Sequence, residues 1–197
     1  MLPIYKLVIN DEDETGVEFV SLVTNPAIEK DFLYFNENKP PLKFAIQDEE
    51  KRIISGPAMI ADLPIYRYDD ARGEYYVVFD KATIFQIAKK WAMGDKYDSV
   101  NIHHDKATNG LSLFESFIID RERGMLPPKG YEDVADGSWF LSYIVNDESI
   151  WAKVKSGEFK GFSVEGYFDF DESQEDKIVN ALMSKLKTIV GKWNGKN

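Results

Sequence analysis

The stretch Phe159–Phe170, FKGFSVEGYFDF, has the alternation of side chains that a β-strand requires. Its residues fall on two faces, with Phe162, Val164 and Phe168 on one face and Ser163, Glu165 and Tyr167 on the other. Glycines at positions 161 and 166 would let another backbone, such as a bound peptide, approach closely. The stretch therefore predicts a strand with one face on the core and a small hydroxyl on the opposite face.

Other stretches of the chain repeat this β pattern and are separated by turn residues. Extended segments are predicted over residues 5–10, 17–23, 31–36, 42–47, 52–61, 74–80, 99–104, 111–120 and 138–145. Helical spacing predicts helices over 81–93 and 148–154, closed by Gly94 and Gly157. The expected fold is mainly β (α+β), a mostly antiparallel core with a few covering helices.

The chain is expected to form one β domain over residues 1–170 and a C-terminal amphipathic helix over 171–197. Ser173 is a candidate cap for this helix. One apolar stripe runs along it through Ile178, Val179, Leu182, Leu186, Ile189 and Val190. Such a stripe predicts a packing or linking element and leaves open whether it joins two copies as a homodimer.

Three turn signals shape the expected topology. Gly56-Pro57 predicts a bend or bulge in the strand 52–61. Asn109-Gly110 predicts a hairpin between 99–104 and 111–120. The Gly- and Pro-containing stretch 121–136 predicts a long surface loop of the kind that often serves binding.

Composition excludes several classes of protein. A net charge of -10 argues against a general nucleic-acid binder, because phosphate contacts need clustered Lys and Arg. No apolar run approaches the roughly 20 residues that cross a bilayer, and the first ten residues do not fit a secretory signal. The chain has no cysteine, which rules out a disulfide framework, a thiolate metal site and a thiol nucleophile. A cytosolic location is expected.

Ser163 and His104 are the side chains best suited to chemistry, although each also has a structural interpretation. Ser163 lacks the G-x-S-x-G pattern of a nucleophile elbow, so spacing alone favours a serine in a closely packed strand. His104 is expected on one face with Val100 and Ile102, at the end of a strand, where a general base can be oriented. His103 is expected to point to solvent. Neighbouring strand residues diverge, so the His pair is not expected to bind zinc.

Glu115 is a candidate partner for His104. It falls on the apolar strand face of Leu113, Phe117 and Ile119, where a carboxylate is costly without a compensating group. A histidine on the preceding strand of the same hairpin would provide one. A structural salt bridge is an equally good interpretation of Glu115.

An ordered set of segments across most of residues 2–170 resembles the XkdF-like phage serine proteases. These segments are 20–29 (VSLVTNPAIE), 55–59 (SGPAM), 64–67 (PIYR), the His104 strand, Glu115-Ser116 and 160–166 (KGFSVEG). That family belongs with the prohead proteases of tailed phages, which resemble the herpesvirus assemblins. The resemblance implies an antiparallel β-barrel with surrounding helices and a serine endopeptidase whose histidine precedes its serine, so Ser163 would be the nucleophile and His104 its base.

The third catalytic residue of such a protease is a histidine or an acid that follows the serine. No histidine follows His104, so only an acid could serve. Glu165 and Asp169 follow Ser163 at same-face positions, but a neighbour two residues along a strand usually points parallel to the serine. Glu115 is therefore the first choice and Glu165 the second. Backbone N–H groups in the loop 121–136 are candidate oxyanion donors.

The resemblance also implies the setting. The protease would work in the host cytoplasm, inside the phage prohead, on scaffold protein, on a major capsid protein propeptide, or on itself, with no cofactor, metal, nucleic acid or membrane partner. Two other functions stay open from the sequence: a non-enzymatic capsid-assembly or scaffold-associated protein with the same fold, and an unrelated β-barrel binding module.

Overall fold

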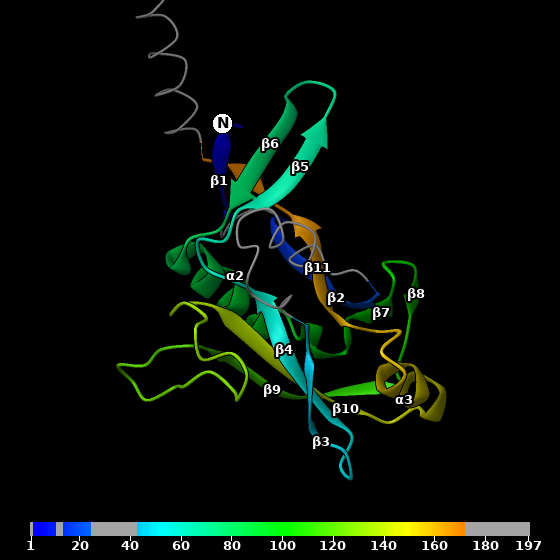
Figure 1. Ribbon diagram of the computed structural model, residues 1–197. Coiled ribbons are helices and arrows are strands. Elements are labelled where there is room, and N and C mark those ends of the chain that lie inside the picture. Colours follow the sequence, from blue (N-terminus) through cyan, green and yellow to red (C-terminus); the bar gives the residue numbers. More distant parts are fainter. Residues whose placement is uncertain (1, 11–13, 25–42, 172–197) are drawn as a thin grey trace, which may run out of the picture.

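Three four-stranded sheets make up the fold in the computed structural model, which describes residues 2–10, 14–24 and 43–171 (Figure 1). The first sheet has the spatial order β12 (Asp169–Phe170), β1 (Ile4–Val8), β6 (Gly73–Val78), β5 (Ile65–Asp69). The second has the order β3 (Ala45–Asp48), β4 (Ile53–Met59), β10 (Trp139–Val145), β9 (Leu111–Ile118). The third has the order β11 (Gly161–Tyr167), β2 (Gly16–Val23), β7 (Val100–Ile102), β8 (Lys106–Ala107).

Most strand pairs are antiparallel, as expected. Only β1 with β6 and β2 with β7 are parallel among the pairs of the described residues. The mainly β prediction is therefore confirmed. The strands of the described residues do not close into a barrel, so this part of the expectation is not borne out by the sheets themselves.

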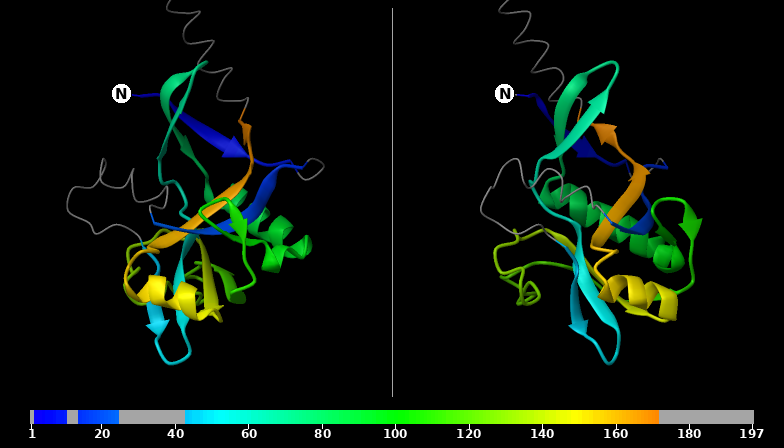
Figure 2. Two further views of the ribbon diagram at one scale, coloured as in Figure 1. Left: turned by 90° about the vertical axis from the view of Figure 1, so that its right-hand side faces the viewer. Right: turned by 45° about the vertical axis from the view of Figure 1, so that its right-hand side comes forward.

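The strand that carries Ser163 links the sheets to one another. β11 pairs with β2, and the chain continues directly into β12, which pairs with β1. Figures 1 and 2 show this orange path running upward from the third sheet to the first sheet, near the β5–β6 hairpin at the top. β11 also packs beside β4 of the second sheet. Ser163 thus lies where all three sheets meet.

Large aromatic side chains fill the core between the sheets. The Phe162 ring lies 5.4 Å from Tyr143 of β10, and the Trp139 ring lies 5.2 Å from Trp91 of α2 (Lys81–Met93). All four of these side chains are fully buried or nearly so. The prediction that Phe162 faces the core is confirmed. β11 and α2 are therefore both held against β10.

The two predicted helices form with polar caps at their starts. Asp80 accepts a hydrogen bond from the Thr83 N–H at 2.8 Å, which caps α2. Asp147 does the same for the Ile150 N–H at 2.9 Å and caps α3 (Glu148–Lys155). A short 3-10 turn, η1 (Lys96–Asp98), leads from α2 into β7.

The predicted hairpin between 99–104 and 111–120 is wrong. β7 pairs with β2 and β8, whereas β9 pairs with β10 in another sheet. Gly110 is needed for a different reason: a Cβ there would lie 2.7 Å from Ile150 Cδ1 and 2.8 Å from Asp147 Cβ. Packing of α3 against this point, rather than a tight turn, decides the local structure.

The bend or bulge predicted at Gly56-Pro57 is confirmed. It lies in β4, which is an inner strand of the second sheet, between β3 and β10. The register of β4 against β10 shifts between Pro57 and Met59, which leaves one extra residue on β4. A Cβ on Gly56 would lie 2.7 Å from Phe44 Cβ. β5 was not expected from the sequence.

Some predictions lie outside the described residues: the strand at 31–36, the start of the one at 42–47, and the C-terminal helix over 171–197. Within the described residues, no helix is long and apolar enough to cross a bilayer.

Candidate active site

His104 lies in a tight turn and not on a strand face, which corrects the expected position. The turn joins β7 to β8, and the Asp105 N–H donates to the Ile102 carbonyl at 3.1 Å. Its two central residues, His103 and His104, have φ values of 54° and 61°, in the left-handed region. This is a type I′ turn, for which glycine or asparagine is the usual choice. Each such residue costs roughly 1 kcal/mol, and strain of this kind concentrates at functional sites.

A row of polar residues crosses the third sheet beside this turn. Ser163 on β11 lies directly opposite Ser21 on β2, and Ser21 lies opposite Asn101 on β7. Residues opposite one another in neighbouring strands share a face, so all three belong to one side of the sheet. Ser21 is fully buried and Asn101 is 5% exposed, whereas Ser163 is half-buried.

The His104 ring contacts Ser21, a member of this row, and Glu165 of β11. Its Nδ1 is 2.9 Å from Ser21 Oγ and 3.1 Å from Glu165 Oε2. The backbone N–H of His104 donates to Asn101 Oδ1 at 3.1 Å. The turn therefore folds the imidazole back across β2 to reach a carboxylate on β11.

The partners of Nδ1 indicate which ring nitrogen carries the proton and which is free to accept one. A carboxylate can only accept, so the contact with Glu165 places the proton on Nδ1. Nε2 is then the nitrogen with a free lone pair. This is the arrangement in which a carboxylate holds a histidine as the base for a serine nucleophile.

Ser163, His104 and Glu165 line one cavity of about 440 Å³. The rest of its lining is mostly apolar. It comes from β1, β4, β5, β11 and the segments that follow β4, β6 and β11: Leu7, Ala58, Met59, Ile60, Leu63, Ile65, Phe79, Phe162, Val164, Gly166 and Phe168, together with Arg67. A larger hollow of about 720 Å³ shares only Glu165 and Gly166 with it. Of these two cavities in the described part of the chain, the smaller one brings the serine and the histidine together.

Among the described residues, no hydrogen bond joins the Ser163 hydroxyl to the imidazole; the hydroxyl that touches the ring belongs to Ser21. Catalytic hydrogen bonds are often long in a free enzyme and tighten in the substrate complex. The structure therefore places the imidazole of His104 and the carboxylate of Glu165 in contact, with Ser163 at the wall of the same cavity.

Glu115, the first choice for the third residue, lies elsewhere. Its Oε2 accepts a hydrogen bond from Ser142 Oγ at 2.6 Å, and Ser142 in turn lies 2.6 Å from Ser55 Oγ. The expectation that Glu115 meets His104 depended on the hairpin that does not form. Glu165, the second choice, is the carboxylate in contact with His104, because the His104 turn brings the ring back to β11.

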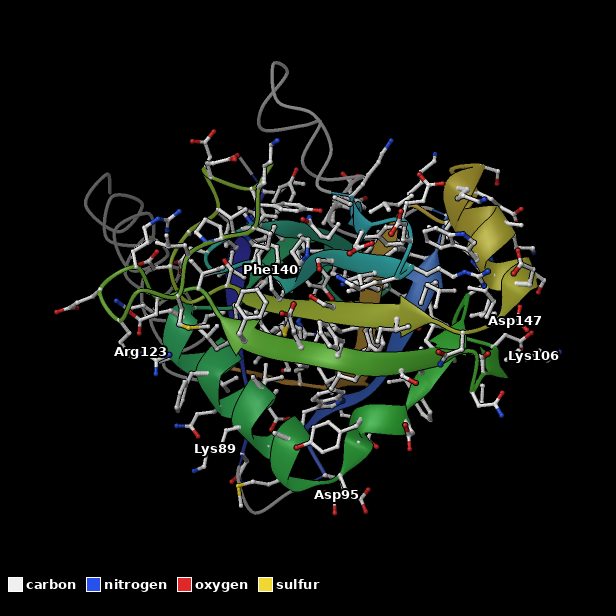
Figure 3. The ribbon with its side chains drawn as sticks, turned by 90° about the horizontal axis from the view of Figure 1, so that it is seen from below. Lys89, Asp95, Lys106, Arg123, Phe140 and Asp147 are labelled. Atoms are coloured by element: carbon white, nitrogen blue, oxygen red, sulfur yellow. The ribbon has the colours of Figure 1, made fainter. Side chains whose placement is uncertain are left out.

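The loop 121–136 is not part of this site. No residue of the loop lines the cavity of Ser163. Arg121 pairs with Asp136 and donates to the carbonyls of Glu132 and Val134, which closes the loop on itself. Figure 3 shows Arg123 of this loop and Lys106 of β8 at opposite ends of the molecule. The expected oxyanion donors of the loop therefore have no support.

Ser21 and Asn101 are the residues of the site that the sequence reasoning missed. Each is a polar residue within a strongly apolar strand, VSLV for Ser21 and VNI for Asn101. A buried polar residue in such a strand needs a hydrogen-bond partner, and that signal could have identified both. Within the described residues, no group of three or more His, Asp or Glu side chains could hold a metal ion.

Comparison with known proteins gives one match. A family model with the description "Putative phage serine protease XkdF" matches residues 43–172, which is more than half of the chain and includes His104, Ser163 and Glu165. No curated protein and no solved structure matches the chain significantly. The chain therefore belongs to the XkdF family of phage proteins.

Proposed function

We propose that this protein is a serine endopeptidase of phage capsid maturation, with Ser163 as nucleophile, His104 as general base and Glu165 as the acid that orients the base. The observation that carries the proposal is the 3.1 Å contact between Glu165 Oε2 and His104 Nδ1 at the cavity lined by Ser163. The family description supports the reaction class.

The proposed reaction is acyl transfer to the serine followed by hydrolysis. In the substrate complex the Ser163 hydroxyl comes within hydrogen-bond reach of His104 Nε2, which takes its proton as Oγ attacks the scissile carbonyl. The imidazolium then protonates the leaving amine. Water attacks the acyl-enzyme, again with His104 as the base, and releases Ser163. Glu165 stabilises the charged ring throughout.

The lining of the cavity supports a preference for an apolar side chain near the scissile bond. Met59, Leu63, Ile65 and Phe168 present hydrocarbon to a space of about 440 Å³, which is ample for one large side chain. Burial of such a side chain stabilises the complex by about 1.5–3 kcal/mol. A substrate segment would lie extended beside β11, where it reaches Ser163.

The setting follows from the same proposal. The substrates are scaffold protein, the propeptide of the major capsid protein, or the chain itself, and cleavage takes place inside the prohead in the host cytoplasm. The three sheets are then an open variant of the assemblin-type barrel, with β11 packed beside β4 where a barrel would close. The C-terminal segment 171–197 would link or pack this domain within the assembly.

A second function has one observation in its favour. Within the described residues Ser163 Oγ and His104 share no hydrogen bond, and this is also expected of a capsid-assembly protein that keeps the fold without peptidase activity.

Co-expression with the neighbouring capsid and scaffold gene products decides between the two. Wild type is expected to shorten one of these proteins or itself, and Ser163→Ala is expected to leave every chain intact because the nucleophile is gone. Ser112→Ala, at a serine of β9 remote from the cavity, serves as the matched control and should process like wild type. Identical behaviour of wild type and Ser163→Ala, read by mass spectrometry, would reject the peptidase.

A further inference from the structure

We propose that Ser21 and Asn101 are positioning residues of this site, which hold His104 and Glu165 in the geometry that catalysis needs. The inference rests on the proposed function and deepens it. Both residues lie in the polar row of the third sheet, and their hydrogen bonds reach the base and the acid at once.

Ser21 fixes the imidazole through the direction of its own proton. Its Oγ lies 2.5 Å from Asn101 Oδ1 and 2.9 Å from His104 Nδ1. The amide oxygen can only accept, so the single hydroxyl proton points to Asn101 and a lone pair faces Nδ1. Nδ1–H therefore has two acceptors, Ser21 Oγ and Glu165 Oε2, and neither favours the alternative tautomer.

Ser21 is not the nucleophile, although its hydroxyl is the one that touches the ring. It is fully buried, so no substrate carbonyl can reach Oγ. Its proton is already donated to Asn101, and its ring contact is with the nitrogen that carries a proton. Ser163, at the wall of the cavity, has the access that Ser21 lacks.

Asn101 joins the histidine turn to the acid. Its Oδ1 accepts from the Ser21 hydroxyl and from the backbone N–H of His104, which ties down a turn in the left-handed region. Its Nδ2 donates to Glu165 Oε2 at 3.4 Å. An amide supplies an acceptor for the first two groups and, on a separate atom, a donor for the third, so asparagine fits the network.

The first test is the substitution Asn101→Asp, which has the same shape and keeps both hydrogen bonds to Oδ1. It removes the donor to Glu165 and adds a second negative charge beside the ring. We expect kcat to fall roughly 10-fold to 100-fold with little change in KM, because the groups are misplaced and not lost. The acidic limb of the pH–rate profile should move to higher pH, since a second carboxylate favours the protonated ring. The charged groups that already face this region are Glu165 and, across the cavity, Arg67.

Ser21→Ala removes the other positioning contact and has a matched control. It should lower kcat roughly 10-fold or more. Ser55→Ala also removes a buried, hydrogen-bonded hydroxyl, that of a serine 3% exposed and 2.6 Å from Ser142 Oγ, but outside the site. Ser55→Ala should lower the free energy of unfolding about as much as Ser21→Ala does, but keep the wild-type kcat. Wild-type kcat and pH profile in both Ser21→Ala and Asn101→Asp would overturn the inference, whereas wild-type processing by Ser163→Ala would overturn the proposed function instead.

Two measurements do not depend on the folding of these variants. Nitrogen NMR of wild type and His103→Gln, with labelled imidazoles, should show His104 with its proton on Nδ1 above neutral pH; a proton on Nε2 contradicts the inference. Diisopropyl fluorophosphate should modify Ser163: Oγ bonds to phosphorus, fluoride leaves, and His104 takes the hydroxyl proton. Modification of Ser21, found by peptide mapping, would make Ser21 the nucleophile and also overturn the inference.

Discussion

At the scale of single residues, the orientation of His104 depends on one turn and one amide. The left-handed conformation of His103 and His104 reverses the chain within two residues, and Asn101 holds the turn through the His104 N–H. A gentler connection would carry the ring away from β11. The strained backbone of this turn is thus what allows the imidazole to contact Glu165.

Glu165→Gln tests the acid at this scale. The amide can present its NH₂ group to the ring and so favour the wrong tautomer, and we expect kcat to fall roughly 10²-fold to 10⁴-fold. Glu115→Gln, which changes the same group in the second sheet, should leave kcat near the wild-type value. Cleavage assays on both variants decide which carboxylate serves His104; a loss confined to Glu115→Gln would reverse the assignment.

At the scale of elements, Asp80 connects the start of α2 to the first sheet. It caps the helix through Thr83 and forms an ion pair with Lys6 of β1 at 2.7 Å. Partial burial by itself would raise the pKa of Asp80, but the hydrogen bonds from Lys6 and from the Thr83 N–H outweigh it and hold the pKa below its usual value of 3.8. Phe79, next to Asp80, lines the cavity, so this junction also supports the site.

Asp80→Asn distinguishes the contribution of the helix cap from that of the ion pair with Lys6. Asparagine caps a helix as well as aspartate does, so only the pairing with Lys6 is lost, at a cost of about 0.5 kcal/mol at neutral pH. A carboxyl with a lowered pKa stabilises the fold above its unfolded pKa and loses that effect as pH falls through the folded value. The difference between wild type and variant should therefore shrink between about pH 5 and pH 2. Urea unfolding across this range checks it; a constant difference would show that the charge does not contribute.

At the scale of the whole molecule, the cavity is made by the meeting of the three sheets. β1 and β5 belong to the first sheet, β4 to the second and β11 to the third, and all four contribute to its lining. Much of its apolar wall, such as Leu7, Met59 and Ile65, therefore comes from segments far from Ser163 in the chain. Changes in the apolar wall should alter substrate preference without touching the catalytic groups.

Ile65→Gln tests whether the apolar wall sets substrate preference independently of the catalytic groups. A polar group in the apolar wall should lower kcat/KM for peptides with a large apolar residue roughly 10-fold, while labelling of Ser163 by the small fluorophosphate stays unchanged. Tyr68→Gln, on the same strand but 63% exposed and outside the cavity, is the control and should match wild type. An unchanged profile of cleaved peptides in Ile65→Gln would mean that the substrate side chain binds elsewhere.

Local patterns in the sequence predicted the elements well, because they depend on neighbouring residues. The alternation around Ser163, the helix over 81–93 and the bend at Gly56-Pro57 all follow from side chains a few positions apart. The choice of Ser163 and His104 came from the family resemblance, together with the expected strand faces of the two residues. These assignments needed no knowledge of which strands pair.

From the sequence alone followed a mainly β chain, the strand face that carries Ser163, and the two histidines from which a base could come. The folded structure was needed to show that β7 pairs with β2 and not with β9, which takes His104 away from Glu115 and brings it to Glu165. It also brought Ser21 and Asn101 to the ring from positions 80 residues apart. The physical reason is that strand pairing is decided by burial of the whole core, whereas a turn signal such as Asn109-Gly110 acts only over its own few residues.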